Sequence, residues 1–263
     1  MSILTTIIEA TRKSVARRRA ARPVSQLEER IAALPPTRDF AGALRQPDLS
    51  FIAEIKRASP SKGWIRKGLN AAEIARQYEA AGARAVSVLT DEEFFRGSLE
   101  DLCLARAAVN LPLLMKDFVV ETYQLYEARA CGADAVLLIA AVLSAQQLRA
   151  LQSQAGELGL QCLVEVYEAS EMNRIDWPST QLLGVNNRNL HTFAVDINHS
   201  VNLLRRCPPH VVRVSESGLS DSHQLAHIHR HGIDAVLIGE SFMRAKHPGR
   251  ALEALRLSQL KAA

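Results

Sequence analysis

The sequence of 263 residues is long enough for two small domains or for one large α/β barrel, and the pattern of its elements decides between them. Apolar residues make up 48% of the chain and charged residues 23%, which is typical of a packed globular protein and excludes a disordered one. The net charge of +4 comes largely from an arginine-rich run at residues 12–22, where no aromatic residue is interleaved, so we expect no nucleic-acid partner.

Residues 1–50 contain two helical patterns, broken by Pro35-Pro36, and a short turn at Phe40–Leu44. Ile7 belongs to an apolar side of the first helical pattern. The arginines of that helix are therefore interpreted as its solvated face. Glu9 argues against a cleaved targeting peptide. Because the segment has too few apolar residues for its own core, we predict one domain over residues 1–263, with residues 1–50 packed on it as a helical extension.

The next segment, Phe51-Ile52-Ala53-Glu54-Ile55-Lys56, is an apolar strand with two opposite charges at its end. Residues two apart on a strand share a face, so Glu54 and Lys56 point the same way. In a closed barrel that face would form a confined pocket, which suits an active site better than a core. The polar loop that follows contains the glycine-flanked segment Ser61–Gly68, which is either a closing lid or an ordered surface loop.

The pattern Gly-x-x-Ala-Val occurs three times, beginning at Gly82, Gly132 and Gly232. Each glycine suits the C-terminus of a helix, and each Ala-Val pair opens an aliphatic run that suits a strand buried on both faces. The repeated pattern therefore marks junctions between a helix and the following strand.

Eight strand ends follow one another at intervals that each hold a strand, a helix and two loops. We place these ends near Lys56, Leu89, Lys116, Leu138, Glu165, Asn186, Ser215 and Ile238. A doubly wound sheet would need a glycine-rich phosphate turn after the first strand, where none is present. The predicted fold class is therefore α/β, a (β/α)8 TIM barrel with an N-terminal helical extension. Its first barrel helix should begin at Asn70, with Glu73 as capping partner.

The longest apolar runs, such as Ala135–Leu143, are far shorter than the roughly 20 residues that cross a bilayer, so we expect no membrane segment. The four cysteines stand at wide spacings without a nearby ligand cluster. They are interpreted as buried free thiols in a reducing compartment, the cytoplasm, and no metal is expected.

Charged and polar residues collect at the predicted strand ends, where barrel enzymes carry their chemistry. They are Glu54, Lys56, Lys116, Glu165, Asn186, Arg188, Ser215 and Ser217. An ionised carboxylate within the aliphatic strand around Glu165 needs a partner. Lysine–glutamate clusters tune pKa values for acid–base catalysis, although purely structural ion pairs remain an alternative.

Glycines also open the loops after the last two strands, at Gly218 and Gly239. They let backbone amides approach an anion, and Glu240 would contribute through its amide with its carboxylate turned outward. With Arg188 and Ser59 nearby, these loops predict a phosphorylated small-molecule substrate.

Six ordered motifs carry a resemblance to a known family. They are Phe51–Gly63, Leu89–Asp91 with Phe94–Ser98, Leu113–Phe118, Leu163–Val166, Gly184–Leu190 and Ser215–Gly218. The chain resembles the indole-3-glycerol-phosphate synthase family of tryptophan biosynthesis from its N-terminal extension to Arg244. The resemblance implies a carboxy-lyase that closes the ring of 1-(2-carboxyphenylamino)-1-deoxyribulose 5-phosphate, with loss of carbon dioxide and water, and that needs no cofactor or metal.

The resemblance also implies roles for residues at the strand ends. Lys116 would be the general acid that protonates the ribulose carbonyl as the aromatic carbon attacks it. Lys56 would hold the anthranilate carboxylate and act as a second acid during dehydration, and the assignment between the two lysines stays open. Glu165 would stabilise the anilino nitrogen and relay a proton, while Glu54 would hold a substrate hydroxyl and orient Lys56.

The remaining implied residues bind and orient the substrate. Asn186 and Ser217 would orient hydroxyl groups and the lysine network. The phosphate would lie on Ser59, Arg188 and the amides near Gly218, Gly239 and Glu240. The aromatic ring would lie in an apolar slot formed by Phe95, Phe118, Leu137 and Leu190.

Two other functions stay open at this point. A phosphoribosylanthranilate isomerase-like barrel takes a similar ligand, but that chemistry uses a Cys and an Asp, whereas the first strand here ends in Glu54 and Lys56. A non-enzymatic scaffold would bind its partners through the basic N-terminal extension. We expect a monomer or a weak homo-oligomer.

Overall fold

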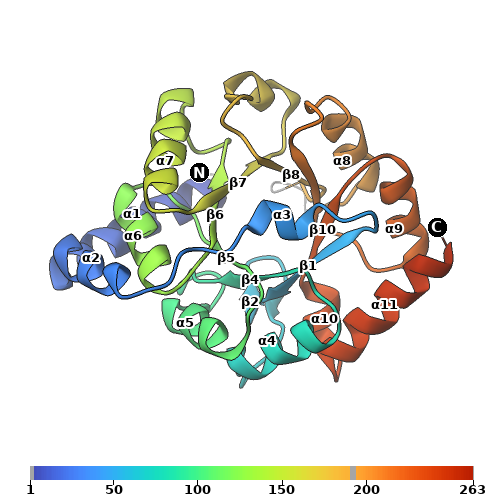
Figure 1. Cartoon of the computed structure of the whole chain (residues 1–263), viewed down its shortest axis with the longest axis horizontal. Coiled ribbons are helices and arrows are strands. Elements are labelled where there is room, and N and C mark those ends of the chain that lie inside the picture. Colours follow the sequence, from blue (N-terminus) through green and yellow to red (C-terminus); the bar gives the residue numbers. More distant parts are fainter. Residues whose placement is uncertain (1–2, 190–193, 263) are drawn as a thin grey trace.

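The computed structural model describes residues 3–189 and 194–262 and contains a closed barrel of eight parallel strands. Around the barrel the strands pair in the order β1, β10, β9, β8, β7, β6, β5 and β4 (Figure 1). They are β1 (Ser50–Ile55), β4 (Ala85–Leu89), β5 (Leu113–Lys116), β6 (Ala135–Ile139), β7 (Gln161–Val166), β8 (Leu182–Asn186), β9 (Val212–Glu216) and β10 (Ala235–Ile238). The predicted (β/α)8 barrel is confirmed, and each predicted strand end lies within one residue of the observed one.

Helices follow the strands and cover the outside of the barrel (Figure 1). They are α4 (Ala71–Ala80), α5 (Leu99–Ala108), α6 (Thr122–Ala130), α7 (Ala145–Glu157), the 3-10 helix η1 (Ala169–Arg174), α8 (Ile197–Leu204), α9 (Ser222–Arg230), α10 (Glu240–Arg244) and α11 (Pro248–Ala262). Helix α4 begins as predicted, because the Asn70 side chain accepts a hydrogen bond from the amide of Glu73 at 3.1 Å.

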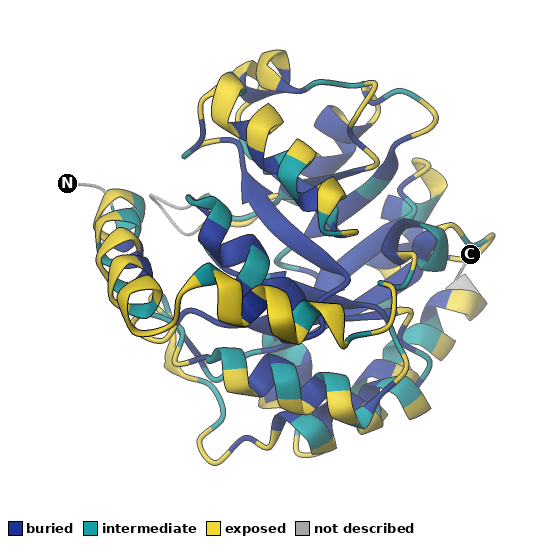
Figure 2. Ribbon diagram, turned by 60° about the vertical axis from the view of Figure 1, so that its left-hand side comes forward, coloured by how far each residue is buried: buried dark blue, intermediate teal, exposed yellow. Residues whose placement is uncertain are grey.

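The strands are buried on both faces, which explains their nearly continuous aliphatic sequences. Alternate side chains of each strand point into the barrel, where Ile52, Leu114 and Leu182 belong to one apolar cluster. The others point outward and pack against the helices, so the strands form the dark buried centre of Figure 2 and the helices show exposed outer faces. The barrel interior and the strand–helix layer are thus two separate cores.

Each of the three repeated Gly-x-x-Ala-Val patterns lies at a junction between a helix and a strand. Gly82, Gly132 and Gly232 have φ values of 88°, 81° and 73°, a left-handed conformation that favours glycine. They follow α4, α6 and α9, as the sequence predicts.

The N-terminal extension forms α1 (Ile3–Ala21), α2 (Val24–Ala32) and the one-turn helix α3 (Phe40–Leu44). Val15 of α1 is fully buried in a cluster with Leu27 of α2 and Tyr123 of α6. Arg18 donates to Glu127 of α6 at 2.8 Å and Arg19 to Glu121 at 3.0 Å, so two arginines of the basic run are paired with carboxylates. The extension therefore lies against α6 on one side of the barrel (Figure 2).

Helix α3 closes the end of the barrel at which the strands begin. Phe40 and Leu44 have no exposed surface and belong to the apolar cluster inside the barrel, together with Ile52. In Figure 1 this helix lies over the centre of the barrel. The short turn expected here is thus a helical plug, because its two large side chains fill the barrel end.

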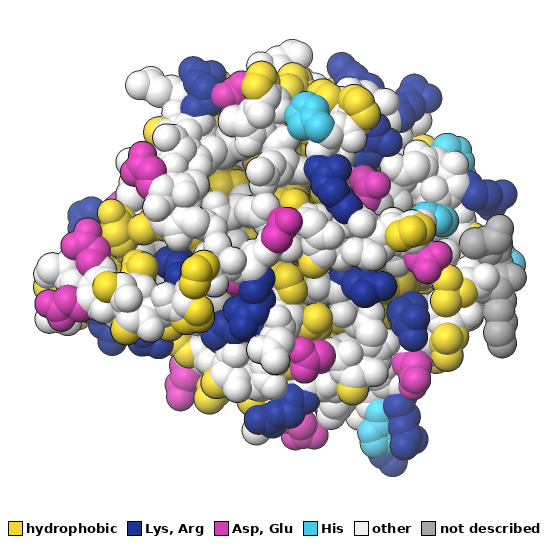
Figure 3. Space-filling view, viewed as in Figure 1, with side chains coloured by type: hydrophobic (Ala, Val, Ile, Leu, Met, Phe, Trp, Pro, Cys, Tyr) yellow, Lys and Arg dark blue, Asp and Glu magenta, His cyan; other side chains and the backbone are white. Residues whose placement is uncertain are grey.

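Charges of both signs are interspersed over the molecular face in Figure 3. Within residues 3–189 and 194–262, we find no helix that combines the length and the apolar character needed to cross a bilayer. Of the four cysteines, Cys131, Cys162 and Cys207 are buried free thiols, whereas Cys103 is only partly buried.

Candidate active site

A cavity of about 480 Å³ opens where the barrel strands end. Every one of the eight strands contributes at least one residue to its wall, as expected for a site at this end of a barrel. The cavity brings together the sequence-predicted residues that the structure describes, with the exception of Ser215. These are Glu54, Lys56, Ser59, Phe95, Lys116, Phe118, Leu137, Glu165, Asn186, Arg188, Ser217, Gly218, Gly239 and Glu240. Leu190 lies outside the described residues.

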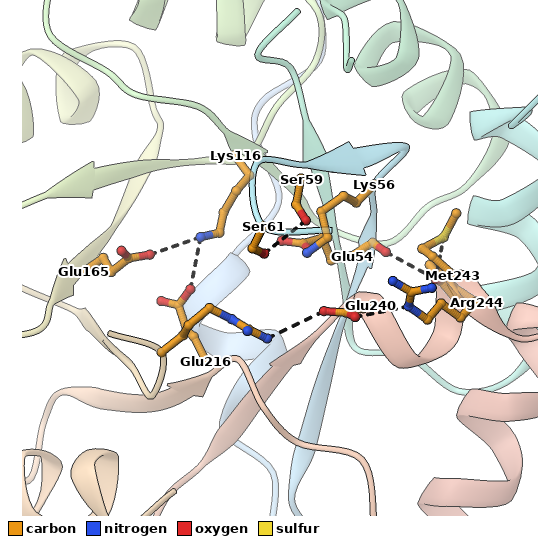
Figure 4. Close-up of polar contacts among 12 residues, drawn as sticks. Glu54, Lys56, Ser59, Ser61, Lys116, Glu165, Glu216, Glu240, Met243 and Arg244 are labelled. Atoms are coloured by element: carbon orange, nitrogen blue, oxygen red, sulfur yellow. Dashed lines mark hydrogen bonds and ion pairs between the residues drawn. The ribbon is translucent and has the colours of Figure 1, made fainter. Parts of the chain in front are cut away.

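Lys116 stands at the centre of the charged part of the cavity (Figure 4). Its Nζ atom lies 3.1 Å from Glu165 Oε2 and 3.1 Å from Glu216 Oε2, and 13% of its side chain is exposed. Burial lowers the pKa of Lys116, but the negative charges of Glu165 and Glu216 outweigh that effect and raise the pKa above its ordinary value. The ammonium group is therefore held charged and can act as a proton donor.

Glu216 is a site residue that the sequence prediction missed. It is 1% exposed, and apart from the Lys116 ion pair its two oxygens have no hydrogen-bond partner among the described residues. Burial raises the pKa of Glu216 to about 8, because Lys116 compensates only in part and Glu165 and Glu54 repel a further negative charge. A carboxyl group that titrates near neutrality can exchange a proton with Lys116.

Ser215, which we expected at the cavity mouth, points the other way. It is fully buried, and its Oγ atom contacts Ser200 at 2.7 Å and Asn187 at 2.9 Å. Alternation along β9 places Val212, Val214 and Glu216 on the inner face, so the serine belongs to the outer one. Ser217 still reaches the cavity because the chain leaves the strand there with a φ of 68°.

Two glycines make room for the buried carboxylates. A Cβ atom on Gly184 would lie 2.0 Å from Glu216 Oε1, and one on Gly239 would lie 2.3 Å from Glu54 Oε1. Any larger residue would push these carboxylates aside. The barrel thus leaves space for two acidic side chains in an otherwise close-packed interior.

Glu54 and Lys56 share a face, as the strand period predicts, and their side chains form an ion pair (Figure 4). The Glu54 side chain is 5% exposed and the Lys56 side chain 17%. The pair lies on β1 and the residue after it, so a second lysine faces the cavity close to the Lys116 cluster.

The part of the cavity between the loops after β9 and β10 is rich in backbone amides and arginines. Ser217 and Gly218 are consecutive left-handed residues, and the first-turn amides of α10 have no helical acceptor. We expected the Glu240 carboxylate to turn outward, but it does not. Its Oε1 accepts from Arg244 Nε at 3.1 Å and its Oε2 lies 3.5 Å from Arg188 Nη2. Attraction to both arginines holds it along the cavity wall, where 29% of the side chain is exposed.

The apolar part of the cavity is built around two phenylalanines. The rings of Phe95 and Phe118 lie 6.0 Å apart between centroids and are tilted by 41°. Leu137 adds to this wall, and so do three residues of α1 that the prediction did not place in the site, Ile3, Leu4 and Ile7. The only sequence signal for them was the apolar side of the first helix.

The loop after β1 is tied to its surroundings. Its short strands β2 (Ala58–Ser59) and β3 (Gly63–Trp64) pair with each other, and Arg66 donates to the carbonyl of Met243 at 3.0 Å. Whether the segment Ser61–Gly68 closes as a lid stays a prediction. Across the described part of the chain, no group of three or more His, Cys, Asp or Glu side chains is placed to hold a metal ion.

Comparisons with known proteins show which family the whole chain is similar to. A family model described as "Indole-3-glycerol phosphate synthase" matches residues 4–255. Proteins named indole-3-glycerol phosphate synthase are similar to the chain: that of Salinibacter ruber is 50% identical over 100% of this chain and 98% of its own length, and that of Rhodopirellula baltica is 47% identical over 98% and 100%.

Two solved structures share the fold at low sequence identity. Tryptophan synthase subunit alpha from Legionella pneumophila aligns with a TM-score of 0.62 and 15% identity, covering 85% of this chain and 97% of its own. For 3-hexulose-6-phosphate synthase from Salmonella typhimurium the TM-score is 0.65 and the identity 12%, with 82% and 100% covered. These two likenesses concern the barrel alone.

Proposed function

The chain belongs to the indole-3-glycerol phosphate synthase family, carboxy-lyases of tryptophan biosynthesis, and on that premise we propose how its cavity carries out the reaction. The substrate is 1-(2-carboxyphenylamino)-1-deoxyribulose 5-phosphate. Its ring carbon that bears the carboxylate attacks the ribulose carbonyl, carbon dioxide leaves to restore the aromatic ring, and the new hydroxyl leaves as water. Both steps on oxygen need a proton donor, and neither needs an electron acceptor.

Lys116 donates the proton to the carbonyl oxygen as the carbon–carbon bond forms. The observation that carries this proposal is the position of its ammonium group, 3.1 Å from each of two carboxylates and on the wall of a cavity that also holds the phenylalanine pair. A fixed positive charge stabilises the negative charge that develops on oxygen, and burial strengthens that interaction.

The other charged residues complete the proton path. Glu165 stabilises the positive charge on the anilino nitrogen and relays a proton, and Glu216 exchanges a proton with Lys116. Lys56 binds the substrate carboxylate and serves as the acid for loss of water, with Glu54 orienting it through their ion pair. Asn186 and Ser217 orient substrate hydroxyl groups from the ends of β8 and β9.

Substrate binding divides between the two ends of the cavity. The phosphate lies on Ser59, Arg188 and the amides near Gly218, Gly239 and Glu240, and it replaces the Glu240 carboxylate, 3.5 Å from Arg188 Nη2, as the partner of that arginine. The aromatic ring lies against the apolar wall that Phe95, Phe118 and Leu137 form. Leu190 is retained in this slot from the family resemblance alone.

We further infer that the protein acts in the cytoplasm as a monomer or weak homo-oligomer, with residues 1–263 forming one domain and no nucleic-acid partner. In the described part of the chain, exposed large apolar side chains are scattered over several elements rather than gathered in one broad patch. An isomerase that uses a cysteine is disfavoured, because no cysteine lies among the described residues of the cavity wall.

Turnover of the synthetic ribulotide, followed by indole fluorescence, tests the proposal. We expect the wild type to form indole-3-glycerol phosphate and Lys116→Ala to lose roughly 10² to 10⁴ in kcat, because it removes the general acid. Substrate binding should persist, since the phosphate and ring contacts remain. Lys13→Ala, which changes an exposed lysine of α1, is the matched control. Well-folded wild type without turnover, or Lys116→Ala with an unchanged kcat, would contradict the proposal.

A further inference from the structure

Two buried aspartates lie next to the catalytic residues without belonging to them. Asp91 comes two residues after the end of β4, and Asp117 directly after β5. They are 8% and 7% exposed, and no Lys or Arg in the described ranges comes within ion-pair distance of either. Burying a carboxylate without a cationic partner costs free energy unless hydrogen bonds compensate, so the hydrogen-bond partners of these two aspartates indicate what they stabilise.

The Asp91 side chain organises the loop that carries Phe95. Its Oδ1 atom accepts hydrogen bonds from the amides of Phe94 at 2.7 Å and Phe95 at 2.9 Å, and its carbonyl accepts from the amide of Gly97 at 2.8 Å. The loop is folded tightly, because a Cβ atom on Gly97 would lie 2.0 Å from the Leu89 carbonyl oxygen. The Asp91 carboxylate therefore holds the amide of Phe95, while the Phe95 carbonyl accepts from the amide of Ala58 at 3.2 Å.

The Asp117 side chain does the same for Phe118. Its Oδ1 atom accepts from the amide of Phe118 at 2.8 Å, and its Oδ2 atom accepts from Thr90 Oγ1, also at 2.8 Å. Thr90 in turn donates its amide to the carbonyl of Lys116 at 3.1 Å. Thr90 thus joins the loop after β4 to the loop after β5, and each loop contains one phenylalanine of the slot.

We propose that Thr90, Asp91 and Asp117 are positioning residues for the aromatic ring of the substrate. Their hydrogen bonds hold the backbone at Phe95 and Phe118 and so set the positions of the two phenylalanine rings that form the slot. This inference rests on the proposed function of the same cavity. It assigns the three residues no contact with the reacting atoms. Their effect on the reaction passes through the two phenylalanines, whose rings are 6.0 Å apart.

The charges around Asp117 make the slot sensitive to acid. Asp91 faces it from the loop after β4 and Arg18 from α1, and a second cavity between these elements is also lined by Arg17, Glu92, Glu93 and Arg96. Burial raises the pKa of Asp117 to about 6, with a further rise from Asp91. Protonation below that pH weakens the acceptors for Thr90 and Phe118. Ionised Asp117 therefore lowers the free energy of unfolding, and its hydrogen bonds to Thr90 and Phe118 are the interactions that its charge strengthens.

Two variants remove the network from separate ends. Thr90→Val deletes the donor to Asp117, and Asp91→Ala deletes the acceptor under Phe95. We expect each to raise the KM for the ribulotide and the inhibition constant of anthranilate about tenfold, because the ring slot loses its spacing. Inhibition by inorganic phosphate should stay unchanged, because the phosphate end of the cavity is untouched.

Conservative variants and the pH profile separate positioning from general stability. Thr90→Ser keeps the hydroxyl and should restore the KM, and Glu92→Ala changes the exposed neighbour of Asp91 as a matched control. In Thr90→Val the acid limb of kcat/KM should move to higher pH, because the hydrogen bond from Thr90 lowers the pKa of Asp117.

The outcomes that overturn the proposal are distinct from a failure of the proposed function. Folded Thr90→Val and Asp91→Ala with unchanged anthranilate inhibition and an unmoved acid limb would refute the positioning role. An equal loss of phosphate inhibition would also refute it, since the loops would then support the cavity as a whole. If the wild type gave no turnover, the function would fail, while direct anthranilate binding by calorimetry would still test the slot.

Discussion

At the scale of single residues, the site is one lysine placed between two buried carboxylates. Lys116 is held 3.1 Å from Glu165 and from Glu216, and the pKa values of Lys116 and Glu216 are both raised: that of Lys116 by the two carboxylates, and that of Glu216 by burial, which its contact with Lys116 offsets only in part. Gly184 is part of this arrangement, because any side chain there would collide with Glu216. Three residues from three strands thus depend on one glycine.

Replacing Glu216 by Gln should separate its cost to the fold from its use in catalysis. The folded pKa of Glu216, about 8, lies above its unfolded value, so ionisation costs the folded state more. This loss of stability is absent below about pH 4.5, grows as the pH rises towards 8 and is complete above it. At pH 9 the free energy of unfolding of Glu216→Gln should therefore exceed that of the wild type by about 1 to 2 kcal/mol, measured by denaturant unfolding. At pH 4.5 the two free energies should differ little.

The same variant, Glu216→Gln, should be more stable than the wild type at high pH but less active. Removing one of the two carboxylates beside Lys116 should lower kcat roughly tenfold, measured by the fluorescence assay. Glu157→Gln, an exposed glutamate at the end of α7, is the control for both measurements. Equal stability curves for Glu216→Gln and wild type across this pH range would contradict the raised pKa.

At the scale of elements, α1 connects the outer surface of the barrel to its catalytic end. Its middle is anchored to α6 by Val15, which has no exposed surface, and by the ion pair of Arg18 with Glu127. Its first turns carry Ile3 and Ile7 to the wall of the cavity. A change at the anchor should therefore reach the substrate without touching it.

The variant Val15→Asp tests this connection. A charge at that buried position should cost about 3 kcal/mol or more, so α1 should leave α6 and withdraw its apolar residues from the cavity. We expect KM for the ribulotide to rise about tenfold with a smaller change in kcat, because the proton donors remain in place. Ala16→Asp adds the same charge at the exposed neighbouring position. A KM increase of the same size in both variants would show that charge, not the anchor, is responsible.

At the scale of the whole molecule, stability and chemistry lie at opposite ends of the barrel. Helix α3 closes one end with Phe40 and Leu44, both fully buried, while the charged cavity occupies the other end. Aliphatic layers, including Leu114 and Leu182, separate the two. The plug should therefore matter for folding and hardly at all for the reaction.

Phe40→Ala should unfold more easily by about 3 to 5 kcal/mol, because the barrel end loses a large side chain and keeps a void. Its kcat and KM at 25 °C should match the wild type, measured by the same fluorescence assay. Phe95→Ala is the reciprocal variant, with a raised KM and a small change in unfolding free energy, since Phe95 is only partly buried. Lowered kcat in folded Phe40→Ala would mean that the two ends are coupled.

The sequence by itself determined the barrel, the positions of its strand ends and most of the cavity residues. Aliphatic runs, the glycines at φ above 70° after α4, α6 and α9, and the charges at strand ends are local signals, because each depends on one element and its neighbours in the chain. Glu54 and Lys56 were paired correctly because the strand period alone places them on one face.

Only the tertiary structure decided which of the remaining polar residues meet. Ser215 and Ser217 were both expected at the cavity, but the strand alternation turns Glu216 inward instead of Ser215, and Ser217 reaches the cavity only because its left-handed backbone breaks that alternation. The apolar residues of α1 in the cavity and the bridge from Thr90 to Asp117 join segments distant in sequence. Such contacts depend on how the closed barrel brings its loops together, and no periodicity within one element contains that information.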